Sequence, residues 1–236
     1  MKTNIAFMGY SDQCIGVLSD SHIFNLVAVI TETGKLVQAT IDRLNKAEIP
    51  IFFVEKTDDV INAIKTINVR LFLIYKFRYI IPPETIKDNN IFNIHPGDLR
   101  NNRGANPLSW SILLGHKSTC LSLHKIDERI DMGLLLAEYS VSVFETDDIK
   151  KLECRLNQGL EYLINELFNF LANKYSGEHI VSGIYRRRIE EKDYTIDLQN
   201  DTFDVMKRKI YSQKSYRGAV LKVGGYAFYV NDIGNL

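Results

Sequence analysis

The sequence predicts an α/β protein in which helices flank a mostly parallel sheet. Short, mostly apolar runs alternate with amphipathic stretches in the first part of the chain, and this alternation is typical of βαβ units. The apolar runs have the length of strands and few polar residues, as strands buried on both faces do. They occupy residues 5–8, 26–30, 51–54, 71–75 and 91–94. Together these features predict a Rossmann-like fold.

Amphipathic stretches between and after these runs predict the helices that cover the sheet. They occupy residues 12–19, 35–46, 57–67 and 108–114. Two further strands are expected at 120–126 and 134–143. A long helix is then expected from Asp148, a suitable N-cap, to about Asn173. Apolar residues recur every three or four positions along one side of this helix. They are Ile149, Leu152, Leu156, Leu160, Leu163 and Leu167.

The composition changes after Gly177, and this change predicts two domains, 1–177 and 178–236. The second is expected to be a small C-terminal α+β appendage, because it is too short for an independent core. Its expected parts are a solvated charged run at 186–193, a helix at 201–211 and a hairpin with strands 219–223 and 226–230.

Composition excludes several classes of function. The chain has 29 Lys and Arg against 29 Asp and Glu, so no bulk attraction to nucleic acid or to an anionic membrane is indicated. No apolar stretch approaches the length that spans a bilayer. Three scattered cysteines and the lack of a signal peptide suggest a cytoplasmic protein with reduced thiols. No histidine pair has metal-ligand spacing, and we therefore predict no metal.

An amide, an imidazole and a carboxylate follow buried strands within a short stretch of sequence. Asn93 and His95 end the run at 91–94, and Asp131 follows the strand expected at 120–126. Taken singly, each has a structural explanation: a core histidine, a backbone-capping asparagine and a turn aspartate. The conjunction favours one site, because an amide and an imidazole can hold an oxyanion while a carboxylate orients the imidazole. By contrast, His124 stands mid-strand and is interpreted as a core histidine.

Four motifs that lie together in the sequence resemble the folate-dependent formyltransferases. This group includes enzymes that act on methionyl-tRNA, on glycinamide ribonucleotide and on nucleotide sugars. The resemblance is close over about residues 70–140 and extends in pattern over the first 175. Its motifs are Asn93-Ile94-His95-Pro96-Gly97, Asn102-Arg103-Gly104, a helix that contains Trp110, and Asp127-x-x-x-Asp131-x-Gly133.

The resemblance implies roles for individual residues and makes 1–177 the catalytic domain. The implied catalytic residues are Asn93, His95 and Asp131. The implied contacts to the pterin ring of 10-formyltetrahydrofolate are Tyr79, Ile80, Ile81 and Asp127. The implied contacts to the acceptor are Asn102, Arg103, Gly104 and Tyr216. The family's usual proline after the histidine is replaced by Arg100, so the loop at 98–104 departs from the pattern.

The Asn-Arg-Gly form resembles the nucleotide-sugar branch, as do two tail motifs, Ile196-Asp197 and Ser215-Tyr216-Arg217-Gly218-Ala219. This branch implies a nucleotide-linked amino sugar as acceptor, with dTDP-4-amino-4,6-dideoxyglucose for O-antigen or other surface polysaccharide as the first choice. The apolar hairpin in the tail suggests a homodimer. A methionyl-tRNA enzyme is expected to carry a larger, basic C-terminal domain. The acceptors left open are a 3-amino sugar, GDP-perosamine, a UDP-linked amino sugar, glycinamide ribonucleotide and methionyl-tRNA. Two other classes are a hydrolase that deformylates the folate and a non-catalytic module that binds folate or a nucleotide sugar.

Overall fold

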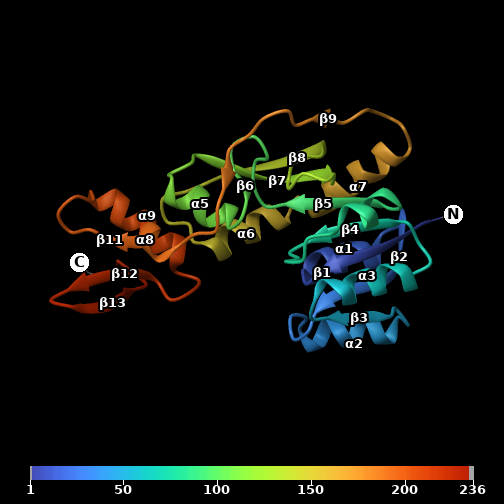
Figure 1. The fold of residues 1–236 in the computed structure, drawn as a ribbon, viewed down its shortest axis with the longest axis horizontal. Coiled ribbons are helices and arrows are strands. Elements are labelled where there is room, and N and C mark those ends of the chain that lie inside the picture. Colours follow the sequence, from blue (N-terminus) through green and yellow to red (C-terminus); the bar gives the residue numbers. More distant parts are fainter. Residues whose placement is uncertain (1, 234–236) are drawn as a thin grey trace. The chain divides into compact units, whose positions relative to one another are not determined.

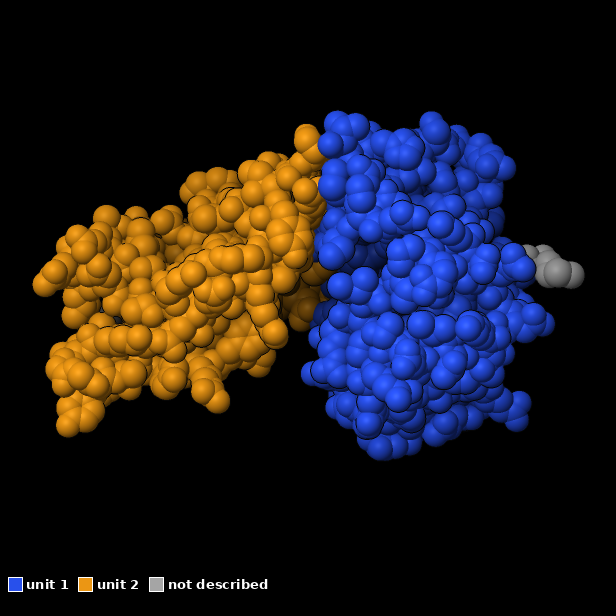
Figure 2. Space-filling model, in the orientation of Figure 1, with its two compact units in different colours: residues 1–95, 122–137, 160–181 blue, residues 96–121, 138–159, 182–236 orange. Residues whose placement is uncertain are grey.

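The computed structural model describes residues 2–233 and divides into two compact units (Figure 2). Unit 1 comprises residues 1–95, 122–137 and 160–181, and unit 2 comprises 96–121, 138–159 and 182–236. These units divide the chain differently from the expected boundary after residue 177. The C-terminal segment forms one unit together with two internal segments, which sequence order alone gives no reason to group.

The main sheet has the strand order β3-β2-β1-β4-β5-β7-β8-β9 (Figure 1). Its strands are β1 (Thr3–Gly9), β2 (Phe24–Glu32), β3 (Ile51–Val54), β4 (Leu71–Tyr75), β5 (Asn90–His95), β7 (Ser118–Lys125), β8 (Leu134–Ser142) and β9 (Glu178–His179). The strands from β3 to β5 in this order pair in parallel, whereas β7 pairs antiparallel with β5. The predicted α/β class with a mostly parallel sheet is confirmed.

Unit 1 contains helices and a close contact between the ends of two strands. Its helices are α1 (Asp12–Asp20), α2 (Gln38–Lys46), α3 (Thr57–Thr66), α4 (Pro83–Lys87) and α7 (Leu160–Leu171). Ser11 caps α1 by accepting a hydrogen bond from the Cys14 N–H at 3.3 Å. At Gly9, where φ is +138°, a Cβ would collide with the Tyr75 carbonyl. The ends of β1 and β4 therefore lie against each other at the point where the strand order reverses, and ligands bind near such points in α/β sheets.

The long helix expected from residue 148 is two helices, so this part of the prediction is wrong. Helix α6 (Ile149–Asn157) belongs to unit 2, and α7 begins at Leu160 in unit 1. Gly159 lies between them, in a position where a Cβ would overlap the ring of Tyr139. The apolar residues keep their three- and four-residue spacing across the break, because each helix buries its own apolar face. The interruption comes from tertiary packing that the pattern does not contain.

Unit 2 is built around α5 (Pro107–Leu113) and α9 (Phe203–Gln213), which pack together and with α6. Its remaining elements are β6 (Arg103–Gly104), β10 (Tyr185–Arg186), α8 (Glu191–Tyr194), β11 (Thr195–Ile196), β12 (Ala219–Val223) and β13 (Tyr226–Val230). Strands β12 and β13 form the expected antiparallel hairpin, with Val223 opposite Tyr226. Buried Ile196, Ile210 and Ala219 form a small core under this hairpin.

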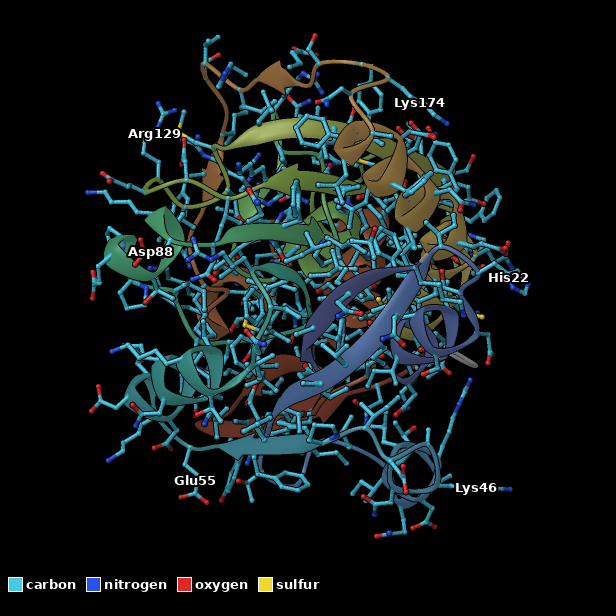
Figure 3. All side chains as sticks on the ribbon, turned by 90° about the vertical axis from the view of Figure 1, so that its right-hand side faces the viewer. His22, Lys46, Glu55, Asp88, Arg129 and Lys174 are labelled. Carbon is cyan, nitrogen blue, oxygen red and sulfur yellow. The ribbon has the colours of Figure 1, made fainter. Side chains whose placement is uncertain are left out.

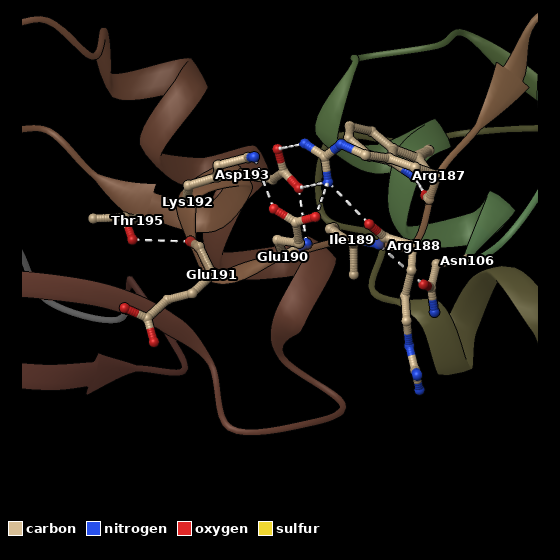
Figure 4. Close-up of polar contacts among 10 residues, drawn as sticks. Asn106, Arg187, Arg188, Ile189, Glu190, Glu191, Lys192, Asp193 and Thr195 are labelled. Carbon is tan, nitrogen blue, oxygen red and sulfur yellow. Dashed lines mark hydrogen bonds and ion pairs between the residues drawn. The ribbon is translucent and has the colours of Figure 1, made fainter.

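The charged run at 186–193 is largely exposed, as expected, and its side chains are also held by hydrogen bonds (Figure 4). The Arg187 guanidinium forms two hydrogen bonds with the Asp193 carboxylate, at 2.6 and 2.7 Å. The Asp193 side chain also accepts from the backbone N–H of Glu190 at 2.8 Å and so closes the first turn of α8. On the other side, the Trp110 indole donates to the Arg187 carbonyl at 2.9 Å. Arg187 therefore ties α8 to α5 within unit 2.

Candidate functional site

Two of the three predicted catalytic side chains stand at the carboxyl end of β5 in unit 1. Asn93 and His95 are two residues apart on one strand, so their side chains leave the same face of the sheet. Strand β7 runs antiparallel beside them, with His124 opposite Asn93 and Ser122 opposite His95. His95 is almost fully buried, whereas Asn93 is partly exposed.

The third predicted residue, Asp131, reaches this strand end from the loop that follows β7. Its Oδ2 lies 3.8 Å from His95 Nδ1, with 14% of the Asp131 side chain exposed. This separation suits an ion pair and is longer than a hydrogen bond. Catalytic contacts of this kind often shorten only when substrates bind. The structure therefore brings Asn93, His95 and Asp131 together as the sequence predicts, while their catalytic role stays a prediction.

The loop that carries Asp131 is tightly folded. Asp131 has a φ of +52°, a left-handed conformation that aspartate tolerates better than most residues. Asp127 Oδ1 accepts a hydrogen bond from the Arg129 N–H at 2.8 Å, and Arg129 projects outward from the loop (Figure 3). At Gly133 a Cβ would collide with the Lys125 carbonyl, which explains the Asp-x-Gly pattern at 131–133. The same turn thus makes Asp127 a loop-shaping residue, and its predicted pterin contact stays a prediction.

His124 is buried in the middle of β7, as expected of a core histidine, and it also contacts Asn93 and Asp131. The Asn93 Nδ2 lies 3.1 Å from His124 Nε2, and Asp131 Oδ1 lies 3.8 Å from the same nitrogen. Burial lowers the pKa of His124 to about 4, although the Asp131 carboxylate acts in the opposite direction. The ring is therefore neutral at neutral pH, and Nε2 can accept a hydrogen bond from the Asn93 amide.

The four side chains form a chain of contacts with distinct chemical capacities. Asp131 lies 3.8 Å from both imidazoles, with one carboxylate oxygen facing each. When His124 Nε2 carries no hydrogen, it can accept one N–H of Asn93, and the second N–H is then left to serve an oxyanion. The His95 imidazole can donate or accept a hydrogen bond. An amide donor, an imidazole and a carboxylate are groups that acyl transfer to an amine can use.

The segment at 76–82, predicted to hold the pterin, leaves β4 beside this strand end. Strands β4 and β5 pair in parallel, with Ile74 opposite Asn93, so their carboxyl ends lie at the same edge of the sheet. Lys76 has a left-handed φ of +57° and turns the chain out of β4. Tyr79 packs edge-on against Phe77, with ring centroids 5.4 Å apart. At the end of the segment, Ile81 is buried in the core, whereas Ile80 is 67% exposed.

The predicted acceptor residues all lie in unit 2. Asn102 is buried, and its amide donates to the Pro107 carbonyl at 2.6 Å and to Ser111 Oγ at 2.9 Å. These bonds connect the Asn102 side chain to α5 and so stabilise the start of this helix. Arg103 and Gly104 form β6, and Gly104 leaves no room for a Cβ beside β10. Tyr216 follows α9 and is exposed. A role of these residues in acceptor binding stays a prediction.

Residues 2–233 contain neither a metal-binding cluster nor a helix that could span a membrane. No group of three or more His, Cys, Asp or Glu side chains in this part of the chain is arranged to hold a metal ion. Within the same residues, no helix has the length and apolar character that crossing a bilayer requires.

Solved structures with similar folds include several formyltransferases. A sugar N-formyltransferase from Shewanella sp. FDAARGOS_354 superposes with a TM-score of 0.76 at 18% identity, over 99% of this chain and 98% of that one. A 4-N formyltransferase from Francisella tularensis gives 0.78 at 16% identity, over 97% and 96%. HypX from Aquifex aeolicus, solved with tetrahydrofolic acid, gives 0.72 at 20% identity, over 96% of this chain and 37% of HypX. At these identities the likeness shows the fold.

Sequence comparison shows the family. Methionyl-tRNA formyltransferase from Prochlorococcus marinus (strain MIT 9215) is 26% identical over 91% of this chain and 73% of that protein. Residues 18–165, more than half of the chain, match the family described as formyl transferase, and this stretch contains Asn93, His95, His124 and Asp131. The chain therefore belongs to the formyl transferase family and is a folate-dependent formyltransferase whose formyl donor is 10-formyltetrahydrofolate.

Proposed function

We propose that the enzyme formylates the amine of a nucleotide-linked amino sugar, and that dTDP-4-amino-4,6-dideoxyglucose is its acceptor in the synthesis of O-antigen or another surface polysaccharide. The observation that carries the chemistry is the contact chain of Asn93, His95, His124 and Asp131 at the end of β5. The acceptor is inferred from the tail's resemblance to the nucleotide-sugar branch.

In the proposed acyl transfer, the residues of the contact chain have separate roles. When bound, 10-formyltetrahydrofolate supplies the formyl group. Asn93, oriented by His124, donates a hydrogen bond to the oxygen on which negative charge develops. Protonated His95 is placed to donate a second one, and each such donor contributes a few kcal/mol. Asp131 lies 3.8 Å from the His95 ring, which it orients, and it can accept the proton that the attacking amine loses, for return to the folate nitrogen that leaves.

The donor site fits the residues present. The segment at 76–82 lies outside helices and strands and starts at the edge of the sheet where β5 ends. Its backbone groups are not committed to a ladder, so they can pair with the polar edge of a pterin ring. Exposed Ile80 offers an apolar surface to the same ring. We assign pterin contacts to Tyr79, Ile80, Ile81 and Asp127, and acceptor contacts to Asn102, Arg103, Gly104 and Tyr216.

The sugar acceptor is supported by likeness over almost the whole of both chains. The Shewanella and Francisella proteins share the fold over 96% or more of each chain, whereas the Prochlorococcus protein aligns over 73% of its own length. The balanced charge of this chain gives no general attraction to tRNA. Methionyl-tRNA is the second candidate, because the enzyme that acts on it is 26% identical over 91% of this chain.

The hairpin of β12 and β13 is proposed to join two subunits. Tyr226 is 73% exposed, and Phe228 and Tyr229 are about half exposed. Aromatic side chains on both faces of a small hairpin are unusual on a solvated surface and typical of interfaces. A twofold homodimer is the default closed assembly for such a self-complementary patch.

A panel of acceptors tests the proposal. Purified enzyme and 10-formyltetrahydrofolate are incubated with 4-amino and 3-amino dTDP-sugars, GDP-perosamine, a UDP-linked amino sugar, glycinamide ribonucleotide and methionyl-tRNA. Mass spectrometry then detects the gain of one formyl group. We expect the 4-amino dTDP-sugar to give the highest kcat/KM, and the His95→Ala variant to lose about two orders of magnitude or more of turnover. Preferential formylation of methionyl-tRNA would replace the sugar by the second candidate, and folate consumption without an acceptor would indicate a hydrolase.

A further inference from the structure

A buried carboxylate stands at the carboxyl end of β2 without a role in the chemistry described so far. Glu32 is the last residue of that strand and is 3% exposed. A buried carboxylate is costly unless an opposite charge or hydrogen-bond donors compensate the lost hydration. Its partners therefore show what the fold gains by keeping it there.

The partner of Glu32 is Arg78, which lies in the segment at 76–82. The Glu32 Oε1 accepts the backbone N–H of Arg78 at 3.4 Å, and Oε2 lies 3.1 Å from the Arg78 Nε. One carboxylate thus binds both the main chain and the side chain of a single residue. The two residues are 46 positions apart in the sequence, so the contact ties the end of β2 to the segment that follows β4.

Arg78 in turn contacts Tyr79 and restrains its side chain. Its Nη2 donates to the Tyr79 hydroxyl at 2.7 Å, and its guanidinium carbon lies 4.8 Å from the centre of the Tyr79 ring. The segment is also fixed at its ends, by the left-handed turn at Lys76 and by buried Ile81. Glu32 holds the middle, where the chain has no helix or strand to restrain it.

We propose that Glu32 is a positioning residue for the formyl donor, because it holds residues 78–81 in their binding conformation before the folate arrives. The inference rests on the proposed contacts of Tyr79, Ile80 and Ile81 with the pterin. A segment that is already ordered loses less conformational freedom on binding, so preorganisation appears as affinity. Glu32 itself contacts no reacting atom in this assignment.

Two substitutions separate this role from a general effect on folding. Glu32→Ala removes both contacts to Arg78, whereas Glu32→Gln keeps the shape and leaves an amide oxygen that can accept the Arg78 N–H. Calorimetric titration with tetrahydrofolate should show binding weakened about tenfold or more in Glu32→Ala, the size of one hydrogen bond to a charged group, and a smaller loss in Glu32→Gln. With saturating donor, kcat and the acceptor KM should stay within about twofold of wild type, while the donor KM rises.

Hydrogen exchange of the ligand-free protein gives a readout that needs neither folate nor an acceptor. Peptides that cover residues 76–82 should exchange faster in Glu32→Ala, and peptides from β1 should not. Asp20→Asn is the control, because it removes an exposed carboxylate paired with Arg43 at 2.7 Å in the same unit, and it should leave exchange, affinity and both KM values unchanged.

The outcomes distinguish this inference from the proposed acceptor. A Glu32→Ala or Glu32→Gln protein with wild-type tetrahydrofolate affinity and wild-type exchange at 76–82 overturns the positioning role. A kcat loss equal to the loss in kcat/KM for the donor also overturns it, since that pattern indicates a part in the chemical step. If the wild-type enzyme formylates no amino sugar while these folate effects hold, the proposed acceptor is wrong and the role of Glu32 stands.

Discussion

The Asn93 amide nitrogen lies 3.1 Å from His124 Nε2, and this contact joins two strands that run in opposite directions. In the tautomer whose Nε2 carries no hydrogen, this nitrogen can only accept, and the Asn93 amide then faces it with an N–H. In the proposed mechanism, the amide that holds the oxyanion is thus oriented by a histidine that needs no contact with the substrate.

Replacing His124 should reduce turnover without abolishing folate binding. In His124→Ala the Asn93 amide loses its acceptor and can rotate, so we expect kcat to fall by about one to two orders of magnitude, somewhat less than the loss of an oxyanion donor itself. Steady-state kinetics with saturating donor measure this. His22→Ala is the matched control at an exposed position and should be neutral. Wild-type kcat in His124→Ala would show that Asn93 needs no such support.

Direct replacement of the predicted catalytic groups should have larger effects. Asn93→Ala, His95→Ala and Asp131→Ala should each lower kcat by about two orders of magnitude or more, because each removes a preorganised group from the contact chain. Their circular dichroism and melting temperatures should stay near wild type, since these side chains stand at strand ends. Any one of them with near-normal turnover would lose its assigned role.

Burial of His124 predicts an acid-sensitive fold. Its folded pKa of about 4 lies below the ordinary value of 6.5, so between these values the unfolded chain binds a proton that the folded chain does not. This group should not reduce the free energy of unfolding above pH 6.5. As the pH falls from 6.5 to 4, protonation of the unfolded chain should lower the free energy of unfolding by up to about 3 kcal/mol. Urea denaturation at several pH values measures the slope. His124→Gln should flatten it, and an unchanged slope in that variant would assign the sensitivity to other groups.

The fold was largely predictable because its strands are short apolar runs. Strands β3 and β4 have the predicted bounds, and the hairpin of β12 and β13 follows its Gly224-Gly225 turn. Two features escaped because they arise from contacts between distant residues. The break at Gly159 depends on the ring of Tyr139, and His124 joins the site only through the pairing of β7 with β5. Knowledge of that pairing would have placed His124 opposite Asn93, since both residues were visible in the sequence.

The exposed hairpin provides a last prediction, on assembly. Tyr226 and Phe228 alternate with Ala227 along β13 and so share one face, and neither is buried within the chain. If this face forms the twofold interface, the double variant Tyr226→Asp and Phe228→Asp should be monomeric in light scattering, because paired carboxylates cannot be buried at low cost. Its tetrahydrofolate affinity should stay at the wild-type value, since the segment at 76–82, proposed to hold the folate, lies in unit 1. Glu55→Gln, an exposed substitution in unit 1, should leave the assembly unchanged. A wild-type protein that is monomeric at all concentrations, or a double variant that stays dimeric, would remove the hairpin from the interface.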